Sequence, residues 1–92
     1  MKQITRRDRL KIYGDLLSIL NEEVNKGKVV LTIVQMRLNV PFDRLKIYII
    51  EIYNLGLIDG ISSLKLTEKG KQYISEYKKI LDFMEQMGIA YR

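Results

Sequence analysis

Residues 31–70 decide the fold, and they read LTIVQMRLNVPFDRLKIYIIEIYNLGLIDGISSLKLTEKG. Two helical patterns in this stretch are separated by Asn39 and Pro41, and Gly56 follows the second pattern. Asparagine tolerates the left-handed backbone that turns a chain after a helix, and proline suits the first turn of the next helix. The stretch therefore predicts a tight helix–turn–helix whose second helix covers residues 42–55.

The segment that leads into this unit is ambiguous. Val29-Val30-Leu31 is short and β-branched, which favours a strand. Thr32 and Gln35 have the spacing of a capping box, and the residues up to Leu38 are good helix formers. We expect a strand over 29–31 and then a helix over 32–38.

The segment after residue 56 reads as a β-hairpin that leads into a long helix. Leu57-Ile58 and the run 64–66 flank Asp59-Gly60 and two serines, which is the pattern of two short strands around a turn. Thr67-Glu68 then opens a helix that can run to Met87. The sequence therefore predicts a hairpin over 57–66 and a final helix.

At the other end, apolar residues at three- and four-residue steps predict a first helix over 5–25, with Thr5 and Asp8 spaced as its capping box. The order is then helix, strand, helix, turn, helix, hairpin, helix. A three-helix unit followed by a hairpin is a winged helix-turn-helix, so we expect a mainly α fold with a small β-hairpin. We expect a winged domain over 1–67 and, continuous with it, a dimerisation helix over 68–92.

The third helix has two faces when its residues are plotted at 100° steps. The expected core face holds Phe42, Leu45, Ile49, Ile52 and Tyr53. The opposite face, which would enter the major groove of DNA in this fold, presents Asp43, Arg44, Ile47, Ile50, Glu51 and Asn54, with Lys46 at its flank.

The composition excludes most catalytic machineries. The 92 residues include no Cys and no His, so thiolate nucleophiles, Ser-His-Asp systems and Cys-built zinc sites are absent. Neither Gly-Lys dipeptide has the upstream glycine and the Ser or Thr of a phosphate-binding loop. An all-carboxylate site stays open, but the 11 acidic residues are scattered. We expect no enzyme, and no catalytic residue, metal, cofactor or small-molecule substrate.

The charge points to an anionic partner. The net charge is +5 and the isoelectric point is about 9.5, which favours nucleic acid. The positive charge is concentrated in residues 1–11 and 26–46. No uncharged run approaches the ~18 apolar residues of a membrane span, and no signal peptide is evident. We expect a cytoplasmic, nucleoid-associated protein with no membrane partner.

Double-stranded DNA is the expected partner. The candidate contacts come from the third helix, from the expected hairpin over 57–66, which is the wing of this fold, and from nearby cations. These contacts are Lys28, Arg37, Arg44, Lys46, Ile47, Ser62, Ser63 and Lys65. Arg6 and Arg7 form a secondary basic segment near the N-terminus. The alternative reading of these cations is that they are ordinary solvated charges.

The last helix has a seam of residues spaced alternately by three and four. The seam runs through Gly70, Tyr73, Tyr77, Ile80, Met84, Met87 and Tyr91. A heptad seam is typical of a coiled coil, so we expect a homodimer with an interface at Tyr73, Tyr77, Ile80, Met84 and Met87. Ile74 and Leu81 form a second stripe for the domain's own core, and Phe83 lies outside both. The seam does not specify parallel or antiparallel pairing.

The whole pattern resembles the small dimeric archaeal winged-helix chromatin proteins that carry a C-terminal coiled-coil helix. The resemblance covers about residues 6–87. It rests on Arg9-Leu10-Lys11-Ile12, the segment 32–36, the turn 39–42, Leu45, Tyr48, Leu55-Gly56-Leu57-Ile58 and the motif 66–70. It implies a homodimer with antiparallel final helices that binds DNA through the third helix and the wing, tolerates many sequences, and organises or bends the duplex.

Two alternatives stay open at this point. One is a gene-specific transcriptional repressor that reads a palindrome, and the other is a protein-interaction module that uses Ile47, Ile50 and Phe83 and binds no DNA. The face of the third helix that would read bases has few cations, and this favours a protein of low sequence specificity over a gene-specific repressor. Whether the dimer would bend one duplex or bridge two is not decided by the sequence.

Overall fold

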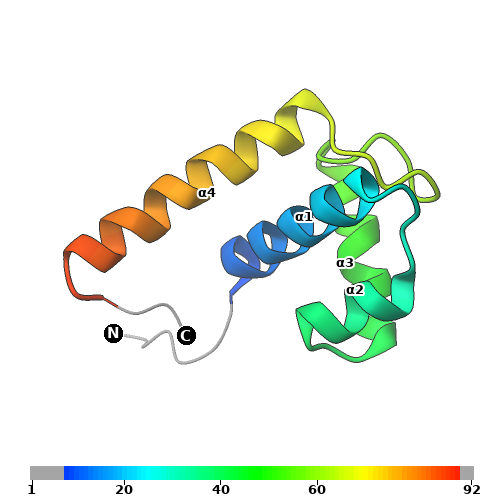
Figure 1. The fold of residues 1–92 in the computed structure, drawn as a ribbon, viewed down its shortest axis with the longest axis horizontal. Helices are drawn as coiled ribbons and strands as arrows, with labels where there is room; N and C mark the ends of the chain where they lie inside the picture. The colour runs from blue at the N-terminus through cyan, green and yellow to red at the C-terminus, as the bar shows by residue number, and fades with distance from the viewer. Residues whose placement is uncertain (1–7, 90–92) are drawn as a thin grey trace.

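The computed structural model describes residues 8–89, and within this range the chain forms four helices (Figure 1). These are α1 (Arg9–Asn25), α2 (Leu31–Leu38), α3 (Phe42–Asn54) and α4 (Glu68–Gln86). Helix α1 lies in the middle, with α4 packed along one side and α2 and α3 on the other. None of the helices in the described range has the length and hydropathy that a membrane span requires.

Helix α1 begins later than expected, at Arg9 instead of residue 5. Asp8 is the N-cap, because its backbone is extended and its carboxylate accepts a hydrogen bond of 3.0 Å from the backbone N–H of Lys11. The expected capping box paired Asp8 with Thr5, which lies outside the described residues. The predicted end of the helix at Asn25 is confirmed.

The strand expected over 29–31 is wrong, because Leu31 is already the first residue of α2. Val30 is the N-cap, and its carbonyl accepts from the N–H groups of Ile33 and Val34 at 3.0 and 3.2 Å. The helix therefore starts before the expected capping pair. Asn39 ends α2 with φ 61° and ψ 53°, which confirms the predicted left-handed turn.

The segment 57–66, here called the wing, does not form the expected β-hairpin. Ile58 and Leu66 make a single antiparallel bridge, and the N–H of Asp59 donates to the carbonyl of Lys65 at 2.9 Å. Leu64 has φ 59° and buries its side chain in the core. Because the chain turns inward at Leu64 and α4 is capped at Thr67, too few residues remain for further antiparallel bridges between the two sides of the wing.

Helix α4 begins as predicted, with Thr67 as its N-cap, and it ends with Met87 as its C-cap. It packs on α1 through two tyrosines. The ring of Tyr77 lies over Gly14, where a Cβ atom would come within 2.4 Å of the ring, and the Tyr73 hydroxyl donates to the Leu10 carbonyl at 2.8 Å.

One core joins the four helices and the wing. Its fully buried side chains are Leu16, Leu17, Leu20, Val34, Leu38, Leu45, Ile52, Leu57 and Ile58. The expected core positions Phe42 and Tyr53 are wrong, since their side chains are 41% and 43% exposed, and Tyr48 is buried in their place. This side of α3 faces α1, where the guanidinium carbon of Arg9 lies 4.9 Å from the centre of the Tyr48 ring.

Candidate nucleic-acid interface

Helix α3 is held at both ends, as a helix that presents side chains to a ligand must be. At its start, the Pro41 carbonyl accepts from the N–H groups of Arg44 and Leu45, both at 3.0 Å. At its end, Gly56 turns the chain with φ 78°, and the Lys69 ammonium donates to the Leu55 carbonyl at 2.6 Å. The α3 side chains are thus carried on a rigid element.

The outward face of α3 is mostly apolar. Ile47 and Ile50 are 46% and 48% exposed. The flanking cations Arg44 and Lys46 are exposed as well, and the Lys46 ammonium lies 5.6 Å from the centre of the Phe42 ring. Within residues 8–89 no carboxylate pairs with either cation. Both positive charges are available to a phosphate.

Glu51 does not belong to this outward face, although the sequence placed it there. Its carboxylate accepts from the Tyr13 hydroxyl at 2.6 Å and forms an ion pair with Arg9 at 3.1 Å. Burial, and next the hydrogen bond to Glu51, raise the pKa of Tyr13. Because Glu51 faces α1 and is neutralised there, α3 repels DNA less than its sequence suggests.

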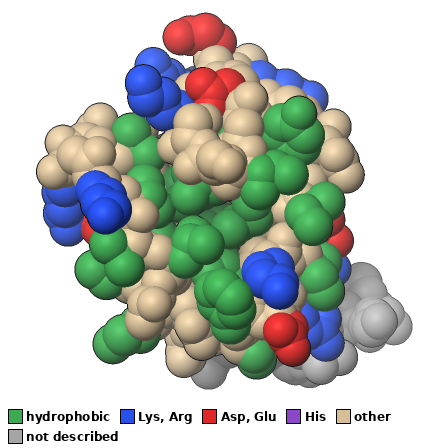
Figure 2. Space-filling view, turned by 90° about the vertical axis from the view of Figure 1, so that its right-hand side faces the viewer, with side chains coloured by type: hydrophobic (Ala, Val, Ile, Leu, Met, Phe, Trp, Pro, Cys, Tyr) green, Lys and Arg blue, Asp and Glu red, His purple; other side chains and the backbone are tan. Residues whose placement is uncertain are grey.

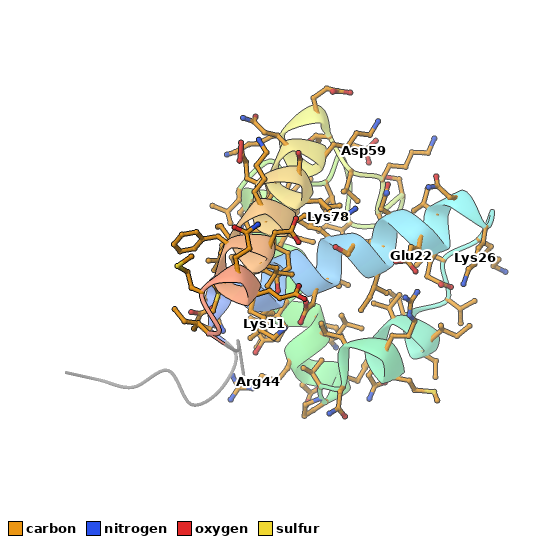
Figure 3. All side chains as sticks on the ribbon, turned by 60° about the vertical axis from the view of Figure 1, so that its left-hand side comes forward. Lys11, Glu22, Lys26, Arg44, Asp59 and Lys78 are labelled. Atoms are coloured by element: carbon orange, nitrogen blue, oxygen red, sulfur yellow. The ribbon has the colours of Figure 1, made fainter. Side chains whose placement is uncertain are left out.

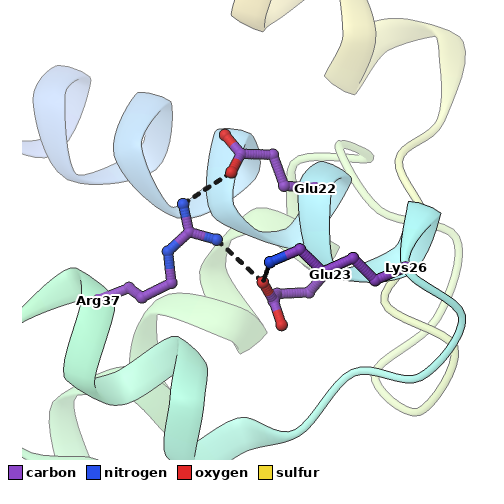
Figure 4. A network of polar contacts seen from close by, with 4 residues as sticks. All are labelled: Glu22, Glu23, Lys26 and Arg37. Carbon is purple, nitrogen blue, oxygen red and sulfur yellow. Dashed lines mark hydrogen bonds and ion pairs between the residues drawn. The ribbon is translucent and has the colours of Figure 1, made fainter.

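Arg37 is the candidate contact whose surroundings differ most from expectation (Figure 4). Its guanidinium pairs with Glu22 at 2.7 Å and with Glu23 at 3.0 Å, and Lys26 reaches the same Glu23 oxygen at 3.0 Å. The Glu23 side chain is only 5% exposed. Arg37 therefore ties α2 to the end of α1, and its charge is compensated within the chain.

The hydrogen bond from Lys26 lowers the pKa of Glu23, against the opposing effect of burial, and Arg37 lowers it further. A carboxylate with a lowered pKa in the folded state stabilises the fold above its ordinary value of 4.5, and this stabilisation is lost as the pH falls through the folded-state value. The Glu22, Glu23, Lys26 and Arg37 network thus predicts a fold that weakens on acidification.

We expect Glu23→Gln to lower the free energy of unfolding at pH 7 and to flatten its fall between pH 5 and pH 3. The amide keeps the shape of the side chain but leaves two cations without their buried counter-charge. Urea unfolding at stepped pH measures both effects. The control is Glu22→Gln, whose side chain is 57% exposed and should matter little. Parallel pH curves for the native chain and Glu23→Gln would contradict the assignment.

The remaining candidates are spread over a wide surface. Lys28 in the α1–α2 connection is exposed, as are Ser62 and Lys65 in the wing, and the Ser63 hydroxyl donates to the Asp59 carboxylate. In Figure 3 Arg44, near the start of α3, and Asp59 of the wing lie toward opposite edges of the molecule. Arg6 and Arg7 lie outside the described residues.

The end of the molecule that carries the wing is largely hydrophobic. Figure 2 views this end and shows hydrophobic side chains gathered over its middle around a hollow, with Lys and Arg side chains scattered singly around them. Exposed apolar residues come from α2, α3 and the wing, among them Ile33, Met36, Ile50, Tyr53 and Ile61. Any ligand of this surface must accept apolar contact as well as charge.

The residues of the predicted seam on α4 divide into two groups, and Phe83, which was expected outside the seam, lies with the second group. Tyr77 is 3% exposed and Tyr73 is half-buried, because both pack on α1 within the same chain. Ile80, Phe83, half-buried Met84 and Met87 lie farther along and form what we call the apolar band. The exposed fractions of Ile80, Phe83 and Met87 are 37%, 58% and 57%. The band continues from a groove that Leu10, Gln72, Tyr73 and Ile80 help to line.

Sequence reasoning missed the side chains that orient α3. The Arg9, Tyr13 and Glu51 cluster and the bond from Lys69 to Leu55 join residues 14 to 42 positions apart. No local pattern marks such pairs, since each residue reads as an ordinary surface position on its own helix. Only the packing of α1 and α4 beside α3 brings the partners together.

Comparison with known proteins agrees with this architecture. The family whose model matches is described as winged helix-turn-helix, and the match covers residues 6–85. The match therefore includes α1, α2, α3, the wing and all of α4 but its last residue. Neither the curated proteins nor the solved structures contain a match to this chain.

Proposed function

Because this chain belongs to the winged helix-turn-helix family, a family of DNA-binding modules, we propose that it is a homodimeric protein that holds duplex DNA with little sequence preference. In this role it organises, bends or bridges the duplex in the nucleoid, as the archaeal winged-helix chromatin proteins that it resembles are thought to do. No step of this role needs an enzyme activity or a cofactor.

The single observation that carries low specificity is the make-up of the α3 face. Only Arg44 and Lys46 are free cations there, and neither lies among a set of polar side chains that would read several guanines. With Lys28 and Lys65 they provide charge without a dense base-reading surface. Binding that depends on phosphate contacts releases counterions and is largely indifferent to sequence.

The apolar band on α4 supports dimerisation. Three of its four side chains are more than a third exposed, and they adjoin an apolar groove on the same side of α4. A second copy related by a two-fold axis would cover the apolar band and the groove at once. In a two-fold dimer the same surface of each copy packs on the other, so one self-complementary surface is sufficient. A helix of 19 residues is about 28 Å long, so the two winged domains would be held apart on a rigid support.

We expect Arg44→Ala and Lys65→Ala each to weaken binding about equally on unrelated duplexes and to reduce the salt slope by about one, which is the loss of one phosphate contact. Fluorescence anisotropy on several random duplexes at stepped salt measures both quantities. The matched control is Lys78→Ala on α4, away from α3 (Figure 3). Arg37→Ala is expected to lower stability in addition, because Glu22 and Glu23 lose their partner.

The same titration separates the alternatives. A preference of about a thousandfold for one duplex, as specific regulators reach, would favour the repressor and contradict the proposal. Absence of binding at low salt would favour the interaction module, for which the exposed Ile47 and Ile50 are the specific observation.

A further inference from the structure

One exposed row of side chains on α3 carries no charge beyond the first turn of the helix. Ile47, Ile50 and Asn54 follow one another at steps of three and four, so they lie in one row on the helix surface. All three are exposed. Asp43 precedes the row by one turn, at the positive end of the helix dipole.

Nothing within the described chain uses this row. The buried side of α3 is formed by Leu45, Tyr48, Ile49 and Ile52, which lie on the opposite side of the helix. Glu51, which lies beside the row, is held by Arg9 and Tyr13 on α1. Within residues 8–89 no group hydrogen-bonds the Asn54 side-chain amide. The row is therefore a free surface with two apolar groups and one amide.

The chemistry of the row matches one kind of base pair. In the major groove, thymine presents a methyl group that apolar side chains contact, and adenine presents the donor and acceptor pair that an asparagine amide satisfies. Guanine, by contrast, is read by Arg or Lys, and the row holds neither. We infer that α3 recognises A·T base pairs, with Ile47 and Ile50 against thymine methyl groups and Asn54 on an adenine edge.

The dimensions and charges of α3 suit this placement. From Ile47 to Asn54 the helix rises about 10 Å, or about three base-pair steps of 3.4 Å. Arg44 and Lys46 lie on opposite sides of the row at 100° per residue, so one cation faces the phosphates of each strand. The inference rests on the proposed DNA-binding function and adds the composition of the preferred duplex. It predicts a preference for A·T-rich DNA, not for one site.

The test compares two duplexes of one mixed sequence, the second with uracil in place of every thymine. Uracil pairs as thymine does but lacks the methyl group. We expect the full-length native chain to bind the uracil duplex about fourfold to fifteenfold more weakly at equal salt, since burial of one methyl-sized group is worth about fourfold. Ile47→Ala/Ile50→Ala should bind both duplexes with nearly equal affinity, while Asn54→Ala should weaken binding to the thymine duplex by about tenfold.

Ile89→Ala, just beyond α4, is the matched control, because its side chain is 53% exposed and undergoes the same chemical change away from α3. It should keep the native ratio between the two duplexes. Equal binding of both duplexes by the native chain would overturn the inference and leave the proposed function intact. An unchanged ratio in Ile47→Ala/Ile50→Ala would overturn it too, whereas absence of binding to either duplex would overturn the proposed function itself.

Discussion

Replacing Gly70 with alanine is expected to lower the free energy of unfolding by about 3 kcal/mol or more, the upper range for overpacking a filled site. A Cβ atom at this position would lie 2.1 Å from the carbonyl oxygen of Leu57 and 3.3 Å from the Cβ of Leu66. The first contact is with backbone, which cannot rotate away as a flexible side chain does. Helix α4 or the wing would have to shift.

Thermal unfolding followed by circular dichroism measures the effect, and a loss of this size lowers Tm by about 12 °C or more in a domain of this length. The matched control is Gln72→Ala, two residues along α4 and exposed, which should change the stability by no more than about 0.5 kcal/mol. An unchanged Tm for Gly70→Ala would mean that α4 does not approach the wing as closely as described.

The second large effect is expected in solution mass. The native chain should have twice its 10.8 kDa at micromolar concentration, and Ile80→Asp/Met87→Asp should have the mass of one chain. Both residues lie in the apolar band and neither is buried in the chain's own core. Two aspartates in each partner would place four unpaired carboxylates in a desolvated interface, at a cost of several kcal/mol each.

Light scattering coupled to size exclusion gives the masses. Ser75→Asp/Gln86→Asp is the control, because both residues are exposed on the polar side of α4 and the charge change is identical. This control should stay dimeric, and both variants should keep the native helix content. A native chain with the mass of a monomer would refute dimerisation, and a dimer that survives Ile80→Asp/Met87→Asp would place the interface elsewhere.

Most helix boundaries could be predicted from sequence because local chemistry decides them. Asn39 in the left-handed region, Gly56 after α3 and Thr67 at the start of α4 each satisfy or release backbone groups within a few residues. The strand over 29–31 failed for a different reason. β-branched residues favour a strand only when a partner strand is available, and the fold provides none within the described residues.

Some properties of the candidate DNA contacts could also be predicted from local sequence, and others depend on residues far away in the chain. That Lys28, Arg44 and Lys65 are exposed cations follows from their place in loops and on polar helix faces. That Arg37 is already paired, and that Glu51 turns away from the outward face, depends on residues of α1 that lie 14 to 42 positions away. The residues next to Arg37 and Glu51 in the sequence do not indicate these partners.

The sequence alone determined the winged helix-turn-helix class, the helix order, the net positive charge and the absence of Cys and His, because each is a property of composition or of short-range spacing. Only the tertiary structure decided which cations are free, which side of α3 faces outward and which part of the α4 seam the chain uses for itself. Tyr77 is the simplest example, since its heptad position fits a dimer but its ring fills the space over Gly14. Ion pairs and close packing depend on which surfaces meet, and only the folded chain brings those surfaces together.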